Sequence, residues 1–172
     1  MMTRTGANRV TIVVTGLAWM GRGIRSVESA IEDMLTNASD EIQVAAYTIT
    51  GGAKEFLQLL QNCLCRGVRV TLIVNRLATQ PKEIQAVIKD MAQRFHHFIL
   101  LDFNPKRAAE DLHAKIVVVD RSTALVGSPN LSWRGLVLNH ELAVVITGPS
   151  AAKIGSLLDA LGRDPRTSVV EV

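Results

Sequence analysis

Short apolar runs alternate with segments of helical periodicity along this chain, and this alternation constrains its fold more than any other feature. The apolar runs are rich in β-branched residues and predict strands, whereas apolar residues spaced three or four apart predict helices. Strands are expected at 10–14, 42–49, 68–74 and 98–103, and helices at 26–37, 53–66 and 81–95. Strands that alternate with helices predict an α/β fold, with a largely parallel sheet flanked by helices on both faces.

The last third of the chain departs from this alternation. Two apolar runs, 112–119 and 123–126, are separated by a short polar segment that begins at Asp120, which predicts a hairpin. A further strand is expected at 141–146 and a closing helix at 150–161. Because the hairpin adds antiparallel pairing, the expected sheet is mixed.

Length and composition narrow the class of protein. The 172 residues suit a single domain spanning 1–172, and 19 basic against 16 acidic residues give a net charge of +3. This charge is compatible with a phosphate-bearing partner, while 4% aromatic residues argue against single-strand binding on a row of stacked rings. Cys63 and Cys65 are too few for a disulfide framework or a zinc site, so we interpret them as ordinary thiols.

The apolar runs of the chain are far shorter than a membrane span. The first nine residues also lack the long apolar stretch of a secretory signal. We therefore expect a cytoplasmic protein without stable membrane association.

His113 and Lys115 carry the first chemical signal. They lie in the strand expected over 112–119, where positions two apart share a face, so their side chains should project together. A neutral imidazole nitrogen can attack phosphorus, and a neighbouring ammonium can hold phosphate oxygens and stabilise charge in the transition state. The pair therefore indicates phosphodiester chemistry.

Four residues downstream complete the candidate site. Asn130 can donate amide hydrogen bonds to phosphate oxygens, Ser128 offers a hydroxyl, and Gly127 allows the backbone to approach a substrate closely. Glu141 is expected to accept a hydrogen bond from His113 and so fix its tautomer. The alternative for Glu141 is a plain surface position on a strand.

Several neighbours of these residues are assigned other roles. Asp120 sits at the hairpin turn, where hydrogen bonds from its side chain to the backbone would support the turn. His140 should face away from Glu141 and is left out of the site. Trp133 either borders the cleft or belongs to the core, and the glycine-rich loop 19–23 is expected at the rim of the site or at a dimer interface.

One spacing resembles the HKD motif of the phospholipase D superfamily. It runs His113-x-Lys115-x4-Asp120, then six residues, then Gly127-Ser128-x-Asn130, and ends on Glu141. The resemblance implies the phospholipase D-like fold and a two-step reaction that needs neither a metal ion nor a cofactor. One histidine attacks the phosphodiester to form a phosphohistidine, a second histidine protonates the leaving oxygen, and water or an alcohol resolves the intermediate.

The chain carries this motif once, and no internal repeat of useful length appears. Most members of the superfamily carry two HKD motifs in one chain. By the resemblance, the small single-motif members build one site from two identical subunits. We therefore expect a homodimer that supplies His113 twice across its two-fold axis.

The motif indicates the chemistry but leaves the substrate open. A nuclease is favoured, because the chain is small, mildly basic and similar to the Nuc-type endonucleases. Other small members accompany partner proteins in phage-defence systems such as DISARM. The alternatives are a phospholipase D or phosphatidyl transferase, which would need an apolar groove, and a non-catalytic nucleic-acid-binding subunit of a defence or repair complex. The intact set of candidate residues argues against the last of these.

Overall fold

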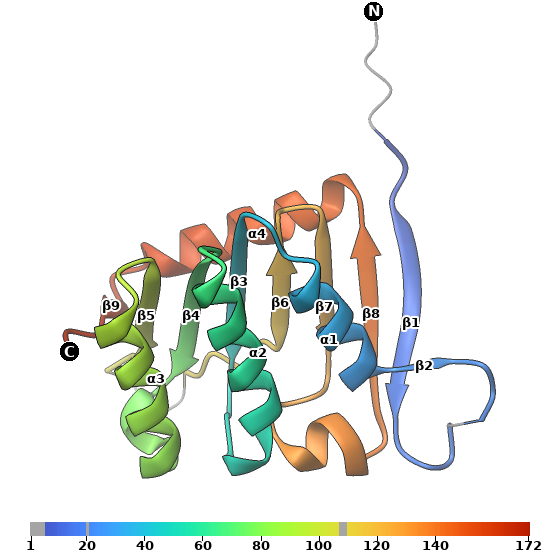
Figure 1. The fold of residues 1–172 in the computed structure, drawn as a ribbon, viewed down its shortest axis with the longest axis horizontal. Helices are drawn as coiled ribbons and strands as arrows, with labels where there is room; N and C mark the ends of the chain where they lie inside the picture. Colours follow the sequence, from blue (N-terminus) through green and yellow to red (C-terminus); the bar gives the residue numbers. More distant parts are fainter. Residues whose placement is uncertain (1–5, 20, 107–109) are drawn as a thin grey trace, which may run out of the picture.

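The computed structural model describes residues 6–19, 21–106 and 110–172. These residues form one nine-stranded sheet with helices on both faces (Figure 1). The helices are α1 (Val27–Thr36), α2 (Lys54–Cys65), α3 (Lys82–Arg94) and α4 (Pro149–Gly162). The strands are β1 (Arg9–Thr15), β2 (Arg25–Ser26), β3 (Glu41–Ala46), β4 (Arg69–Asn75), β5 (Phe98–Phe103), β6 (Ile116–Val119), β7 (Thr123–Gly127), β8 (Glu141–Thr147) and β9 (Thr167–Val169).

The helices form where the sequence periodicity predicts them. Helix α1 begins after Ser26, whose hydroxyl accepts a hydrogen bond from the Ser29 backbone N–H at 3.1 Å and so satisfies one free donor of the first turn. Helix α2 ends before Gly67, which adopts the left-handed conformation that a helix end often needs. The predicted helices are therefore confirmed, with ends shifted by at most a few residues.

The sheet runs in the order β2-β1-β8-β7-β6-β3-β4-β5-β9. Its mixed character is confirmed, but the expectation of a largely parallel sheet is wrong. In the described part of the chain, β1–β2, β3–β4 and β4–β5 pair in parallel and the other five pairings are antiparallel. The reason is that β6, β7 and β8 form a meander beside β3, while β1 and β9 join the sheet antiparallel to β8 and β5.

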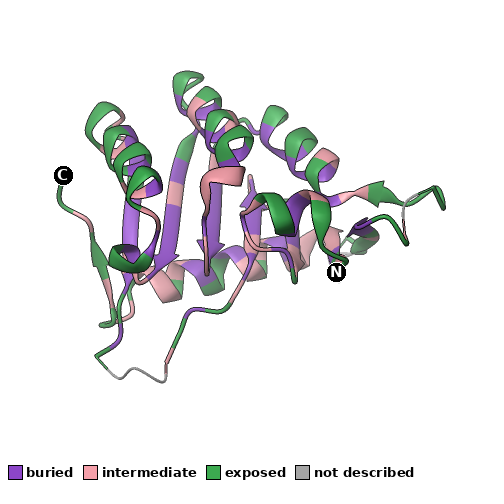
Figure 2. Ribbon diagram, turned by 90° about the horizontal axis from the view of Figure 1, so that it is seen from below, coloured by how far each residue is buried: buried purple, intermediate pink, exposed green. Residues whose placement is uncertain are grey.

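Two apolar layers hold the sheet between its helices, as Figure 2 shows. The larger layer lies under α1, α2 and α3 and contains fully buried side chains such as Leu35, Leu60 and Leu72. The smaller layer lies under α4, where Leu158 packs with Ile73. Burial of apolar side chains on both faces is the main driving force for this arrangement. Among the described helices, none is both long and apolar enough to cross a membrane.

Ends of several strands and helices lie together at one edge of the sheet. β3 and β4 finish there, α2 and α3 begin there, and β6 starts there because Ile116 pairs with Ala45 near the end of β3 (Figure 1). Helix N-termini carry partial positive charge, and the carboxyl ends of parallel strands commonly bind ligands in open α/β sheets. The fold therefore prepares this edge for an anionic ligand.

Candidate active site

His113 and Lys115 lie at this edge of the sheet but not within a strand. The strand expected over 112–119 is shorter than predicted, because β6 begins only at Ile116. Without a full strand ladder, the segment is held partly by a side chain: the Leu112 backbone N–H donates to Asn75 Oδ1 at 2.9 Å. The predicted strand position of the two residues is therefore wrong.

Their side chains nevertheless meet, as predicted. Lys115 Nζ lies 3.1 Å from His113 Nδ1 and 3.1 Å from Nε2, and it donates to the His113 backbone oxygen at 2.8 Å. His113 is exposed, whereas Lys115 is only 8% exposed. Burial lowers the pKa of Lys115 from its ordinary value, and the negative charge of Glu141 opposes this shift. The arrangement presents an accessible imidazole with a largely desolvated amine directly against it.

Tyr47 completes this group, and the sequence analysis missed it. Its ring centroid lies 4.5 Å from the His113 ring at an angle of 57°, and Lys115 Nζ lies 5.0 Å from the same centroid. Tyr47 directly follows β3, at the edge where β6 begins. The signal was present in the sequence, because a polar aromatic residue at the carboxyl end of a buried parallel strand is well placed to face a ligand site.

Ser128 and Glu141 form a pair of their own. Ser128 Oγ donates a short hydrogen bond to Glu141 Oε2, and Asn139 Nδ2 donates to Glu141 Oε1 at 3.2 Å. Among the described residues, neither partner of the Glu141 carboxylate is His113. The predicted hydrogen bond between Glu141 and His113 is thus absent from this single chain, and Glu141 acts on the site instead through its charge on Lys115.

Asn130 is held tightly by the chain that follows it. The Ser132 backbone N–H donates to the Asn130 backbone oxygen at 2.8 Å, and a Cβ on Gly135 would lie 2.4 Å from that same backbone oxygen. Gly135 belongs to a short π-helix, Arg134–Leu138, which the sequence analysis did not predict. Asn130 Oδ1 is one of the two buried side-chain atoms in the described residues that have no hydrogen-bond partner. A buried acceptor without a partner costs free energy in the folded chain.

Gly127 has a structural reason different from the predicted one. A Cβ at this position would lie 2.4 Å from the Ala143 Cβ, because Gly127 pairs with Ala143 across β7 and β8. The glycine is therefore needed for strand packing. The expectation that it admits a substrate to the backbone stays a prediction.

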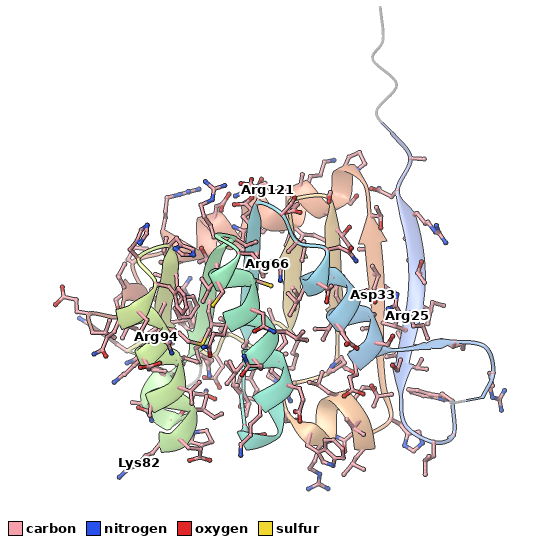
Figure 3. The ribbon with its side chains drawn as sticks, in the orientation of Figure 1. Arg25, Asp33, Arg66, Lys82, Arg94 and Arg121 are labelled. Atoms are coloured by element: carbon pink, nitrogen blue, oxygen red, sulfur yellow. The ribbon has the colours of Figure 1, made fainter. Side chains whose placement is uncertain are left out.

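Asp120 lies at the opposite end of β6, where it bonds to the backbone, as predicted, but to the distant segment 39–41 and not to its own turn. Its carboxylate accepts hydrogen bonds from the Ser39 N–H and hydroxyl at 3.0 and 2.9 Å, from the Asp40 N–H at 2.8 Å and from the Glu41 N–H at 2.9 Å. Burial opposes ionisation, but the backbone donors outweigh it and hold the pKa of Asp120 below its usual value. Figure 3 shows the next residue, Arg121, at the edge of the sheet opposite to Lys82.

The remaining neighbours lie outside the His113 group. His140 Nε2 accepts from the Ala18 N–H at 3.2 Å, and its ring meets Trp19 edge to face, which confirms its exclusion from the site. Met20 of the glycine-rich loop lies outside the described residues. Trp133 is 49% exposed and lines a cavity of about 470 Å³ between α1 and α2, so it is not a core residue. In the described parts of the chain, no cluster of three or more His, Cys, Asp or Glu side chains is arranged to hold a metal ion.

Comparisons with known proteins identify the family of this chain. The family model described as "Cardiolipin synthase, PLD-like domain" matches residues 31–158, which contain the whole motif. The DISARM protein DrmC of Bacillus paralicheniformis is 24% identical over 136 residues, covering 78% of this chain and 55% of that protein. A protein of Bos taurus named 5'-3' exonuclease PLD3 is 31% identical over 139 residues, covering 77% of this chain and 26% of that protein. This chain thus spans only about half, or less, of the length of these relatives.

A solved structure shares the fold over nearly the whole chain. Nuc from Salmonella typhimurium, a phospholipase D family member, superposes with a TM-score of 0.74 at 21% identity, covering 96% of this chain and 100% of that one. At this identity the likeness shows the fold alone, and the expected phospholipase D-like fold is confirmed. Because the family model matches well over half of the residues, the chain belongs to the phospholipase D superfamily.

Proposed function

We propose that this chain is a phosphodiesterase that cleaves nucleic acid with His113 as its nucleophile. The observation that carries the proposal is the contact between a buried amine and an exposed imidazole, in which Lys115 Nζ lies 3.1 Å from both ring nitrogens of His113. An exposed imidazole is accessible to a phosphodiester. A cation that touches the ring can bind the oxygens of the phosphorus that the ring attacks.

The proposed reaction has two displacement steps and uses no metal ion or cofactor. In the first, an imidazole nitrogen of His113 bonds to phosphorus while the bond to the leaving oxygen breaks, and His113 of a second copy donates a proton to that oxygen. In the second, the same second histidine takes a proton from water, and the water oxygen displaces His113 from phosphorus. The first imidazole then returns to its starting state.

The other candidate residues are proposed to hold the phosphoryl group in place. Lys115 neutralises its charge, and the Asn130 amide donates hydrogen bonds to its oxygens. Ser128 and Glu141, which are hydrogen-bonded to each other, hold negative charge near Lys115 and so favour its ammonium form.

An exposed apolar face of the sheet supports the proposed homodimer. Val10 and Ile12 on β1 and Leu142 on β8 are each about half exposed. The strand register places them on the α4 side of the sheet, because Val10 pairs with Ile146, which pairs in turn with Ala124 under α4. Helix α4 leaves this end of the sheet uncovered, and a second copy of the chain would bury it.

A polar cavity beside Tyr47, the residue that packs on His113, favours nucleic acid over a lipid. A cavity of about 180 Å³ beside Tyr47 is lined by polar side chains, among them Thr48, Thr79 and Asp111. An acyl chain would gain little from such a lining, whereas sugar and phosphate groups can hydrogen-bond to it. The similarity to a protein named an exonuclease also supports a nuclease. The similarity to DrmC supports a role with partner proteins in phage defence. We also propose that residues 1–172 form a single domain.

The test compares substrates in a buffer that contains a metal chelator. Plasmid DNA, single-stranded RNA and vesicles of a choline phospholipid are each incubated with the protein and with His113→Ala. We expect cleavage of a nucleic acid by the wild type, none by the variant and no release of choline. Choline release without nucleic-acid cleavage would contradict the nuclease and favour a lipid enzyme. Tight binding of DNA without cleavage would favour the non-catalytic subunit.

A further inference from the structure

We propose that Tyr47 is a positioning residue that stabilises the ammonium form of Lys115 and orients it against His113. A path of hydrogen bonds through Gln80 and Asn75 holds the Tyr47 backbone beside the His113 segment. This inference rests on the proposed role of the His113 and Lys115 pair. It adds a residue that the motif does not contain, and it concerns the charge state that the pair needs.

The Tyr47 ring lies against both Lys115 and His113. Lys115 Nζ lies 5.0 Å from the Tyr47 centroid, within the range in which the negative face of an aromatic ring attracts a cation. The same ring packs at 4.5 Å against His113. Because Lys115 is buried, little water competes with this attraction, and a desolvated cation benefits most from it.

The buried side-chain amide of Gln80 holds the Tyr47 backbone. Gln80 Nε2 donates to the Tyr47 backbone oxygen at 3.1 Å and to the Asn75 backbone oxygen at 2.8 Å, while Gln80 Oε1 accepts from the Ile49 N–H at 3.0 Å. Gln80 is buried, and these bonds use both donors and the acceptor of its amide. It therefore ties the end of β3 to the end of β4.

Asn75 links the end of β4 to the His113 segment. Asn75 is buried at the end of β4, where its Oδ1 accepts from the Leu112 N–H at 2.9 Å and its Nδ2 donates to Asp111 Oδ1 at 3.2 Å. Leu112 directly precedes His113, whose side chain packs on Tyr47. A closed path thus runs from Tyr47 through Gln80, Asn75 and Leu112 to His113 and back to Tyr47. The path replaces the strand pairing that this segment lacks.

Two titratable side chains, those of His113 and Glu141, act directly on Lys115. His113 touches it from the preceding segment, and Glu141 acts on it from β8. Asp111, the other nearby acid, is paired with Asn75 and with Arg76 Nε at 2.9 Å. Burial lowers the pKa of Lys115 and so disfavours its ammonium form, whereas the charge of Glu141 and the face of the Tyr47 ring both favour it.

The test measures the charge state of Lys115 without any turnover. The rate at which acetic anhydride modifies Lys115 is followed by mass spectrometry from pH 6 to pH 11, with exposed Lys82 as an internal reference. Tyr47→Leu removes the aromatic face, and Tyr47→Phe keeps it. Below the midpoint of its titration, we expect Lys115 to react about fivefold faster in Tyr47→Leu, and as in the wild type in Tyr47→Phe.

The pH dependence separates this effect from simple exposure of the amine. If Tyr47→Leu only opened the site, the rate would also rise at the highest pH, where the amine is mostly deprotonated in every variant. Equal rates there, with a gain restricted to lower pH, support the inference. A gain at all pH values, no gain, or an equal gain in Tyr47→Phe would overturn it.

Two further variants complete the test. Tyr47→Met serves if Tyr47→Leu does not give a cooperative thermal transition, because it also lacks an aromatic face. Gln80→Met removes the buried amide at similar size and should raise the low-pH reactivity of Lys115 in the same direction, by about twofold. No change in Gln80→Met would overturn the part assigned to the hydrogen-bonded path. Since labelling needs no substrate, failure of the proposed nuclease and failure of this inference are seen separately.

Discussion

The two ends of β6 carry residues of one sequence motif, yet they differ in burial, bonding and accessibility. At one end, His113 is exposed and its segment is held by the Asn75 side chain and the Tyr47 ring. At the other end, Asp120 accepts four hydrogen bonds that tie the hairpin turn to the chain before β3. The four residues of β6 separate the two ends by roughly 13 Å of strand.

This difference shows that a sequence motif can combine two separate functions. The His113 end leaves a reactive group open to solvent, with a desolvated cation behind it. The Asp120 end satisfies its charged group completely from within the chain. A change at the first end should therefore alter chemistry with little effect on stability, and a change at the second should do the reverse.

The largest expected effect is on turnover at the His113 end. His113→Ala should lower kcat by at least about a thousandfold, because the nucleophile is lost. Its thermal midpoint should stay close to that of the wild type, because the side chain is exposed. Steady-state kinetics and a melting curve on the same preparation check both expectations, and residual turnover near the wild-type level would remove His113 from its role.

The next effect is on stability at the Asp120 end. Asp120→Ala should lower the free energy of unfolding by about 3 kcal/mol, because it leaves the donors of Ser39, Asp40 and Glu41 without their acceptor. Denaturant titration measures this loss. The kcat of the folded variant should match the wild type, and a large fall in kcat at unchanged stability would make Asp120 part of the chemistry.

A smaller effect is expected in the pH dependence of stability. Because its backbone hydrogen bonds hold the pKa of folded Asp120 below its unfolded value, the carboxylate contributes its full stability above about pH 4. That contribution is lost as the pH falls through the lower, folded pKa. The wild type should therefore lose more stability than Asp120→Asn between neutral and acidic pH. Parallel curves for the two proteins would contradict this assignment.

The smallest effect concerns Arg121, next to Asp120. Its guanidinium pairs with Glu41 and Asp159, and its backbone has a φ of 49°, in the left-handed region. Arg121→Ala should cost about 1 kcal/mol, because the pairs are partly exposed and the left-handed backbone remains. Arg121→Gly loses the same pairs but relieves the backbone, so it should be the more stable of the two by denaturant titration.

The sequence predicted those features that depend on local pattern. Strand β5 was predicted with the bounds that the structure has, and Ser26 was correctly placed at the start of α1. The contact between His113 and Lys115 was also predicted, although the structure places both residues before β6 and not within a strand. In each case, the pattern and its structural consequence lie within a few residues of each other.

Features that depend on distant parts of the chain were not predicted. Periodicity indicates where strands occur but not which strands pair, so the insertion of β6 beside β3 was missed and the sheet was expected to be largely parallel. Tyr47 and Asn75 meet the His113 segment from positions more than thirty residues away, and Gln80 joins these two residues to each other. The partner of Glu141 depends on the register of β7 and β8, which the sequence does not show.

Subunit mixing tests whether two copies of His113 form one site, as we propose. Wild-type chain and His113→Ala are mixed in equal amounts, allowed to exchange subunits, and assayed on the nucleic acid that the wild type cleaves. If each site needs both histidines, only wild-type pairs are active, and activity should fall to about a quarter of that of an equal total amount of wild type. Activity of about half, proportional to the wild-type chain alone, would show that each chain acts by itself.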